Sequence, residues 1–141
     1  MKGIIIYNTK SGNTELLGNK MKEILEKSGH EIVIKRDKEI KDQIESESDF
    51  FNPYDLICLG SCTHIVGPAF SFRKILKKIN RLNIDGKKLI SFSTSSHGQG
   101  IASNKKIKKK MSKLDHVGSI GCDELENENA LIAFEEIVKK L

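Results

Sequence analysis

The stretch KGIIIYNTKSGNTELLG, residues 2–18, decides the fold of this chain. It opens with a continuous apolar run, Ile4 to Tyr7, which is typical of a strand that is buried on both faces of a parallel sheet. A loop of small polar residues follows, and apolar residues then recur at helical spacing until Ser28-Gly29 supplies a stop. The segment therefore predicts a strand over 2–7 and a helix over 14–27.

The rest of the chain repeats this order of strand, loop and helix. Apolar runs predict further strands over 31–35, 54–60, 88–92 and 117–121, and amphipathic patterns predict helices over 70–79, 101–114 and 130–141. The acidic stretch 37–52 leaves open whether it forms a loop or one or two helical turns. Five such βα units indicate an α/β fold, a three-layer α/β/α sandwich whose ligands bind outside the carboxyl ends of the strands.

Composition narrows the class of protein. A chain of 141 residues, 38% hydrophobic and 30% charged, predicts a single globular domain over 1–141. The first apolar run is too short for a secretion signal or a membrane span, so we expect a cytoplasmic protein that does not bind membranes. The cysteines at 58, 62 and 122 show no CxxC spacing, so we expect neither zinc nor a structural disulfide.

The net charge of +5 bears on the choice of partner. Most of the excess comes from lysines in two helical stretches, without aromatic residues between them to stack on bases. We therefore expect no nucleic-acid binding. The lysines of 105–113 are interpreted first as a solvated helix face and second as a docking surface.

The loop after the first predicted strand suits a phosphate group. Residues 8–14 bring hydroxyl groups, a permissive glycine and the backbone N–H groups of a helix start to one point. The alternative is an ordinary helix start that is capped by a hydroxyl side chain. The spacing of a GxxxxGK[ST] loop is missing, which disfavours a nucleoside triphosphatase.

The pattern I-I-Y-x-T-x-x-G-x-T over residues 5–14 resembles the signature of the flavodoxin family, which usually has alanine at the position of Gly18. This resemblance implies a flavodoxin-like fold with a five-stranded parallel sheet of order 2-1-3-4-5 and one bound FMN. The loop residues that would hold the FMN phosphate are Thr9, Lys10, Ser11, Gly12, Asn13 and Thr14.

Two further loops, 60–68 and 92–100, resemble those that cover the two faces of the flavin ring in flavodoxins. The FMN contacts implied are Ser61, Cys62, Thr63, His64 and Ile65 in the first loop, and Thr94, Ser95, Ser96, His97 and Gly98 in the second. Neither loop has the tryptophan or tyrosine that commonly stacks on the ring, so we expect FMN to be held less tightly than is typical. Whether the two histidines contact flavin or are merely solvated stays open.

The resemblance implies a small electron carrier that passes electrons through FMN between redox partners. Typical flavodoxins are acidic, whereas this chain is basic, so we expect an acidic, ferredoxin-like partner. Two alternatives stay open: an FMN-dependent NAD(P)H or quinone reductase, and a module of this fold without flavin. A dinucleotide fingerprint at 98–103 is disfavoured because it lacks the third glycine. We expect a monomer or a weak dimer.

Overall fold

The core of the molecule is a parallel sheet. A computed structural model describes residues 1–64, 67–95, 101–122 and 128–141 of the chain. Within these residues the parallel strands are β1 (Lys2–Asn8), β2 (Glu31–Arg36), β3 (Leu56–His64), β5 (Lys88–Thr94) and β6 (Asp115–Cys122). Their order across the sheet is β2-β1-β3-β5-β6. Because β5 and β6 are the fourth and fifth parallel strands along the chain, this is the predicted order 2-1-3-4-5, which is confirmed.

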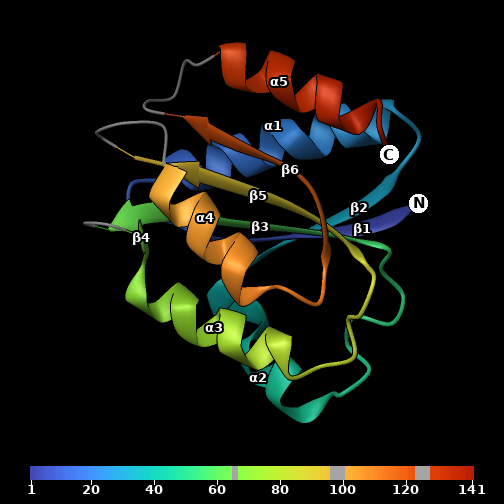
Figure 1. Cartoon of the computed structure of the whole chain (residues 1–141), viewed down its shortest axis with the longest axis vertical. Helices are drawn as coiled ribbons and strands as arrows, with labels where there is room; N and C mark the ends of the chain where they lie inside the picture. Colours follow the sequence, from blue (N-terminus) through green and yellow to red (C-terminus); the bar gives the residue numbers. More distant parts are fainter. Residues whose placement is uncertain (65–66, 96–100, 123–127) are drawn as a thin grey trace.

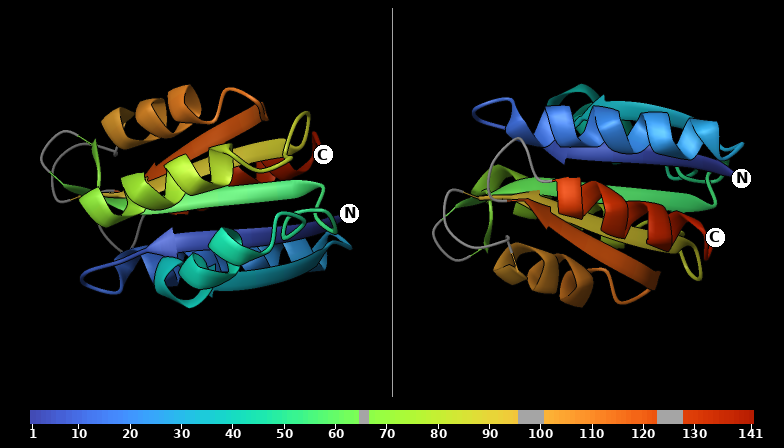
Figure 2. Two further views of the ribbon diagram at one scale, coloured as in Figure 1. Left: turned by 90° about the horizontal axis from the view of Figure 1, so that it is seen from below. Right: turned by 90° about the horizontal axis from the view of Figure 1, so that it is seen from above.

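Helices cover both faces of the sheet (Figure 1). One face carries α1 (Asn13–Lys27) and α5 (Glu128–Val138), and the other carries α2 (Asp37–Ser46), α3 (Phe70–Asn80) and α4 (Ile101–Lys110). Figure 2 shows the two faces in turn. Each face buries its own apolar cluster, one between the sheet and α1 and α5, the other between the sheet and α2, α3 and α4. The predicted three-layer α/β/α arrangement is confirmed.

Helix α2 resolves the ambiguous stretch after residue 37. Ile40 and Ile44, one helical turn apart, are fully buried against the sheet. At the start of the helix the backbone N–H of Arg36 donates to the carboxylate of Glu39 at 3.0 Å. Two buried isoleucines and a paired first turn therefore hold a ten-residue helix that is otherwise polar.

Strand β3 is longer than predicted. The apolar run ends at Gly60, but the strand continues to Cys62 because Ser61 still lies opposite Asn8 of β1 and Cys62 opposite Thr94 of β5. A short strand β4 (Gly67–Pro68), which the sequence did not predict, then pairs antiparallel with the end of β3. Residues 61–64, expected in a loop, therefore belong to a strand.

Two glycines mark places where the layers come close. A Cβ atom on Gly60 would lie 2.1 Å from the ring of Phe92, so this ring packs directly over the backbone of β3. A Cβ atom on Gly118 would lie 2.6 Å from the side chain of Ile137 in α5. In the same strand, β6, the pairing with β5 steps from His116 to Gly118 and leaves Val117 out of register, which is a β-bulge at the edge of the sheet.

None of the described helices has the length and apolar character needed to cross a membrane.

Candidate functional site

The carboxyl ends of β1, β3 and β5 lie side by side. Asn8, the last residue of β1, is level with Ser61 of β3, which in turn is level with Ser93 of β5. The strands are parallel, so the segments that follow them leave the sheet at one edge (Figure 2). This edge is where α/β sheets of this kind bind ligands, and it gathers the three segments that the sequence analysis singled out.

The loop between β1 and α1 is held in a defined shape by two hydrogen bonds. The hydroxyl of Thr9 accepts from the backbone N–H of Gly12 at 2.9 Å, and the guanidinium of Arg36 donates to the carbonyl of Thr9 at 3.0 Å. Gly12 has a φ of 91°, a left-handed conformation that strains residues with side chains. Ser11 and Lys10 are exposed at the tip of the loop.

Helix α1 begins without a side-chain cap. Gly12 is its N-cap residue, and no side-chain cap hydrogen bond is made there among the described residues. The first backbone bond of the helix runs from the N–H of Leu16 to the carbonyl of Gly12 at 3.0 Å. The N–H groups that precede Leu16 in the first turn are therefore available to an anion, and the positive end of the helix dipole points the same way. The hydroxyl of Thr9 does bond at this helix start, but it accepts from the N–H of Gly12, which precedes the first turn.

Thr14 and Thr94 link two of the predicted segments. Thr14 lies in the first turn of α1 and is fully buried, and its hydroxyl oxygen lies 2.8 Å from that of Thr94 at the end of β5. The two residues were predicted separately as FMN contacts from loops far apart in the sequence. The structure brings them together and commits part of the hydrogen-bonding capacity of each hydroxyl to the other.

The end of β3 is fastened by its own polar side chains. The hydroxyl of Ser61 donates to the carbonyl of Cys62 at 2.8 Å and accepts from the N–H of Ala69 at 3.1 Å, and Ser61 is fully buried. The hydroxyl of Thr63 lies 2.9 Å from that of Ser103 in α4. These hydroxyls fix the end of β3 relative to the start of α3 and to α4.

Asn8 is a junction that the sequence analysis missed. Its amide group donates to the carboxylate of Asp37 at 2.8 Å and to the hydroxyl of Ser71 at 3.2 Å, and its carbonyl oxygen accepts from the thiol of Cys62 at 3.6 Å. Asn8 and Asp37 are both buried. One side chain therefore ties β1 to the starts of α2 and α3 and to β3. The only sequence signal for it is a polar residue at the end of an apolar strand.

The comparisons with known proteins agree with this architecture. Neither a protein-family model nor a curated protein sequence matches the chain. Solved structures do match over nearly its whole length. The flavodoxin of Streptococcus pneumonia TIGR4 superposes with a TM-score of 0.82 at 12% identity, covering 100% of this chain and 97% of that one. The fold of the chain is flavodoxin-like.

Two other solved structures resemble this flavodoxin-like chain to a similar degree. The two-electron reduced flavodoxin of Megasphaera elsdenii has a TM-score of 0.79 at 19% identity, covering 99% of both chains. Flavodoxin 2 of Bacillus cereus, in its oxidised state, has a TM-score of 0.78 at 20% identity, covering 99% of this chain and 96% of that one. At these identities the likeness establishes the fold.

Several predicted site residues of the flavodoxin-like chain can be placed only in part. Ile65, Ser96, His97 and Gly98 lie outside the described residues, and His64 is described only as backbone in β3. Ser95 donates its N–H to the carbonyl of Cys122 at 3.1 Å, which joins the end of β5 to the end of β6. The described residues at the ends of β3 and β5, 61–64 and 94–95, include no phenylalanine, tyrosine or tryptophan.

Cations surround this edge of the flavodoxin-like fold. Arg36 contacts the β1–α1 loop, as described above, and the guanidinium of Arg73 donates to the carbonyl of Pro68 in β4 at 3.0 Å. The side chain of Lys106 lies so close to Gly67 that a Cβ atom there would be 2.8 Å from its Cδ. A positive rim of this kind favours an anionic ligand.

Tyr7 adds a neutral group beneath the loop. Its hydroxyl donates to the carboxylate of Glu15 at 2.8 Å. Burial, the bond to Glu15 and the negative charge of Glu15 together raise the pKa of Tyr7 to about 12. The phenol therefore stays protonated at neutral pH and keeps the Glu15 carboxylate engaged beside the first turn of α1.

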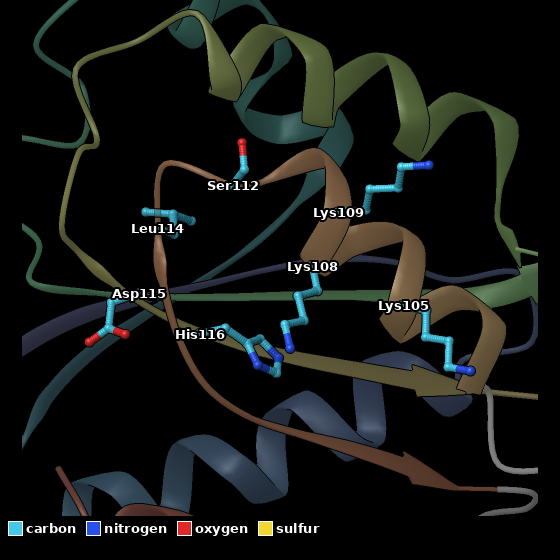
Figure 3. A pocket seen from close by; sticks show the side chains of 7 residues that line it. All are labelled: Lys105, Lys108, Lys109, Ser112, Leu114, Asp115 and His116. Carbon is cyan, nitrogen blue, oxygen red and sulfur yellow. The ribbon is translucent and has the colours of Figure 1, made fainter.

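The described loop fits the phosphate of a flavin mononucleotide. A Cβ atom at Gly12 would meet nothing within 4 Å, so the space over the loop is open, and the uncapped first turn of α1 faces it. Backbone N–H groups and exposed hydroxyls bind a phosphate dianion without a lysine. The larger of the two described hollows, about 600 Å³, lies elsewhere, between α4 and the start of β6 (Figure 3), and contains none of the predicted site residues.

Proposed function

We propose that this flavodoxin-like chain binds FMN at the carboxyl edge of its sheet and carries electrons between redox partners. The observation that supports this most directly is the uncapped first turn of α1, held open by Gly12 beside the ends of β3 and β5. FMN supplies the redox chemistry, because its ring accepts and releases electrons singly or in pairs. The protein's part is to bind, orient and shield the cofactor.

The described residues divide this work among them. Ser11, Asn13 and the N–H groups of the first turn of α1 bind the phosphate. Thr9, with Arg36 on its carbonyl, holds the loop in its binding shape, and the bond between Thr14 and Thr94 fixes that loop to the end of β5. The ends of β3 and β5 position the flavin ring. The other predicted FMN contacts rest on the resemblance to flavodoxins.

Two of the similar solved structures support a redox role. The flavodoxin of Megasphaera elsdenii is in a two-electron reduced state, and flavodoxin 2 of Bacillus cereus is in an oxidised state. The net charge of +5 supports an acidic partner, such as a ferredoxin-like carrier. The reductase alternative differs from a carrier in needing a substrate pocket at the flavin.

The deciding experiment is a visible absorption spectrum of the purified protein. We expect a yellow protein that releases FMN on denaturation, or an apoprotein that quenches the fluorescence of added FMN with a one-to-one end point. Oxidation of NAD(P)H with added quinone then separates a reductase from a carrier. A chain that neither copurifies with FMN nor binds added FMN is the flavin-free module, and the proposal fails.

A further inference from the structure

A hollow of about 250 Å³ lies between α2 and α3. Its lining includes the aromatic ring of Phe70 and the side chains of Lys38, Lys41 and Lys74. Phe70 is the first residue of α3 and is 69% exposed, although large apolar side chains are usually covered. The hollow therefore combines an uncovered aromatic ring with a cationic rim.

Most of the lysines around this hollow are in no salt bridge among the described residues. Among the described residues, Lys38, Lys41 and Lys74 have no ion pair, and the ammonium of Lys74 lies 5.4 Å from the centroid of the Phe70 ring. The remaining lining lysine, Lys78, is paired with Glu45. The one lining carboxylate, Asp37, is buried and accepts from the side chain of Asn8. The rim is therefore net positive.

The hollow adjoins the proposed FMN site through a single side chain. Asp37 and Ser71 both line the hollow, and both are bonded to Asn8, at 2.8 Å and 3.2 Å. Asn8 ends β1 and is followed directly by the loop that would hold the phosphate. A partner seated in the hollow would thus lie beside the carboxyl edge of the sheet, and electron transfer requires such closeness because its rate falls steeply with distance.

The second hollow, on α4, is also basic but is placed differently. Lys105, Lys108 and Lys109 surround it, and Figure 3 shows these side chains together with His116. His116 lies near the start of β6, at the amino ends of the parallel strands, whereas the site lies at their carboxyl ends. Lys108 and Lys109, near the end of α4 that leads to the start of β6, therefore provide a matched control: two lysine charges on the part of α4 away from the carboxyl ends of the strands.

We propose that the hollow between α2 and α3 is the docking surface for an acidic redox protein, with Phe70 as the apolar anchor. This rests on the proposed function. The partner presents an apolar side chain to Phe70 and carboxylates to Lys38, Lys41 and Lys74. Aromatic anchors surrounded by charged rims are typical of protein interfaces, and the charge complementarity steers the encounter. With a ferredoxin as donor, two ferredoxins each lose one electron for every FMN that gains two, and protons come from solvent.

The test uses the FMN-loaded protein and a purified acidic [2Fe–2S] ferredoxin. The variants are Phe70→Ala, the double reversal Lys41→Glu with Lys74→Glu, and the control reversal Lys108→Glu with Lys109→Glu. We measure the ferredoxin dissociation constant by calorimetry and the rate of flavin reduction by stopped flow, both at low ionic strength. Dithionite reduction and the visible spectrum check that the flavin is unchanged.

We expect the double reversal at Lys41 and Lys74 to weaken ferredoxin binding and slow reduction at least about tenfold, and Phe70→Ala to do so several-fold. The control reversal should change either quantity by less than about twofold, and added salt should shrink the effect of the reversals but not that of Phe70→Ala. Equal effects of the two reversals would indicate steering by net charge alone and overturn the docking surface. So would wild-type protein that fails to bind ferredoxin. If the protein binds no flavin, its visible spectrum shows that the proposed function is wrong. Calorimetry with ferredoxin still tests the docking surface in that case.

Discussion

The side-chain oxygens of Thr14 and Thr94 lie 2.8 Å apart within the buried interior, although the two residues are 80 positions apart in the sequence. We expect Thr14→Val and Thr94→Val each to lower the free energy of unfolding by about 1–3 kcal/mol, because each leaves one buried hydroxyl without its partner. The double variant should cost less than the sum of the single ones, since it removes both hydroxyls together. Urea unfolding of the four proteins measures this coupling. Strictly additive costs would mean that the contact is energetically silent.

The exposed hydroxyl of Ser11 tests the phosphate assignment separately from stability. Ser11→Ala should weaken FMN binding by about tenfold or more, because a hydrogen bond to a charged group is worth roughly 1.5–3 kcal/mol. Riboflavin, which lacks the phosphate, should bind the variant and the wild type alike. Ser28→Ala, at the opposite end of α1, serves as the control and should alter neither affinity. If riboflavin binding falls as much as FMN binding, Ser11 does not face the phosphate.

The close approach of Phe92 to Gly60 predicts a strong effect of one methyl group. Gly60→Ala would place a Cβ atom 2.1 Å from the ring, which the core can accept only by shifting β3 or β5. We expect a loss of at least about 1–3 kcal/mol in thermal or urea unfolding, the usual cost of overpacking. In a protein that already carries Phe92→Leu, Gly60→Ala should lower the free energy of unfolding by less than it does in the wild type. A harmless Gly60→Ala would show that the two strands separate easily.

Tyr7 predicts a loss of stability in alkali. Its pKa is raised from 10.0 to about 12, so the folded protein holds the phenolic proton more tightly than the unfolded chain does. This contribution to stability is complete below pH 10 and disappears as the pH rises through 12. Tyr7→Phe should remove the part of the stability profile that falls in this window, and Glu15→Gln should lower the pKa of Tyr7. Spectrophotometric titration of the phenol checks the second effect, and unfolding at a series of pH values checks the first.

The sequence predicted the fold well because burial on both faces leaves a continuous apolar run, as at Ile4 to Tyr7. It failed at the end of β3, where the strand continues past Gly60 through backbone pairing although the polar Ser61 interrupts the apolar run. It was also ambiguous at α2, whose helix depends on two buried isoleucines within a polar stretch.

The candidate site could be predicted as a set of segments but not as a set of contacts. Local patterns indicated which loops meet at the carboxyl ends of the strands, because the loops that follow neighbouring parallel strands all lie at that end of the sheet. The junction at Asn8 and the guanidinium of Arg36 on the carbonyl of Thr9 depend on how α2 and β2 are placed against β1. Such long-range polar contacts leave no periodic trace in the sequence.

The bulge at Val117 has a consequence for the behaviour of the protein at high concentration. Strand β6 forms one border of the sheet, and the unpaired backbone groups of a straight border strand can recruit a strand from another molecule. The step in pairing at Val117 interrupts this row of donors and acceptors, and Asp115 places a charge at its exposed beginning. The irregularity in β6 therefore protects the chain from stacking edge to edge, and straightening it by deleting Val117 should make the protein prone to aggregate.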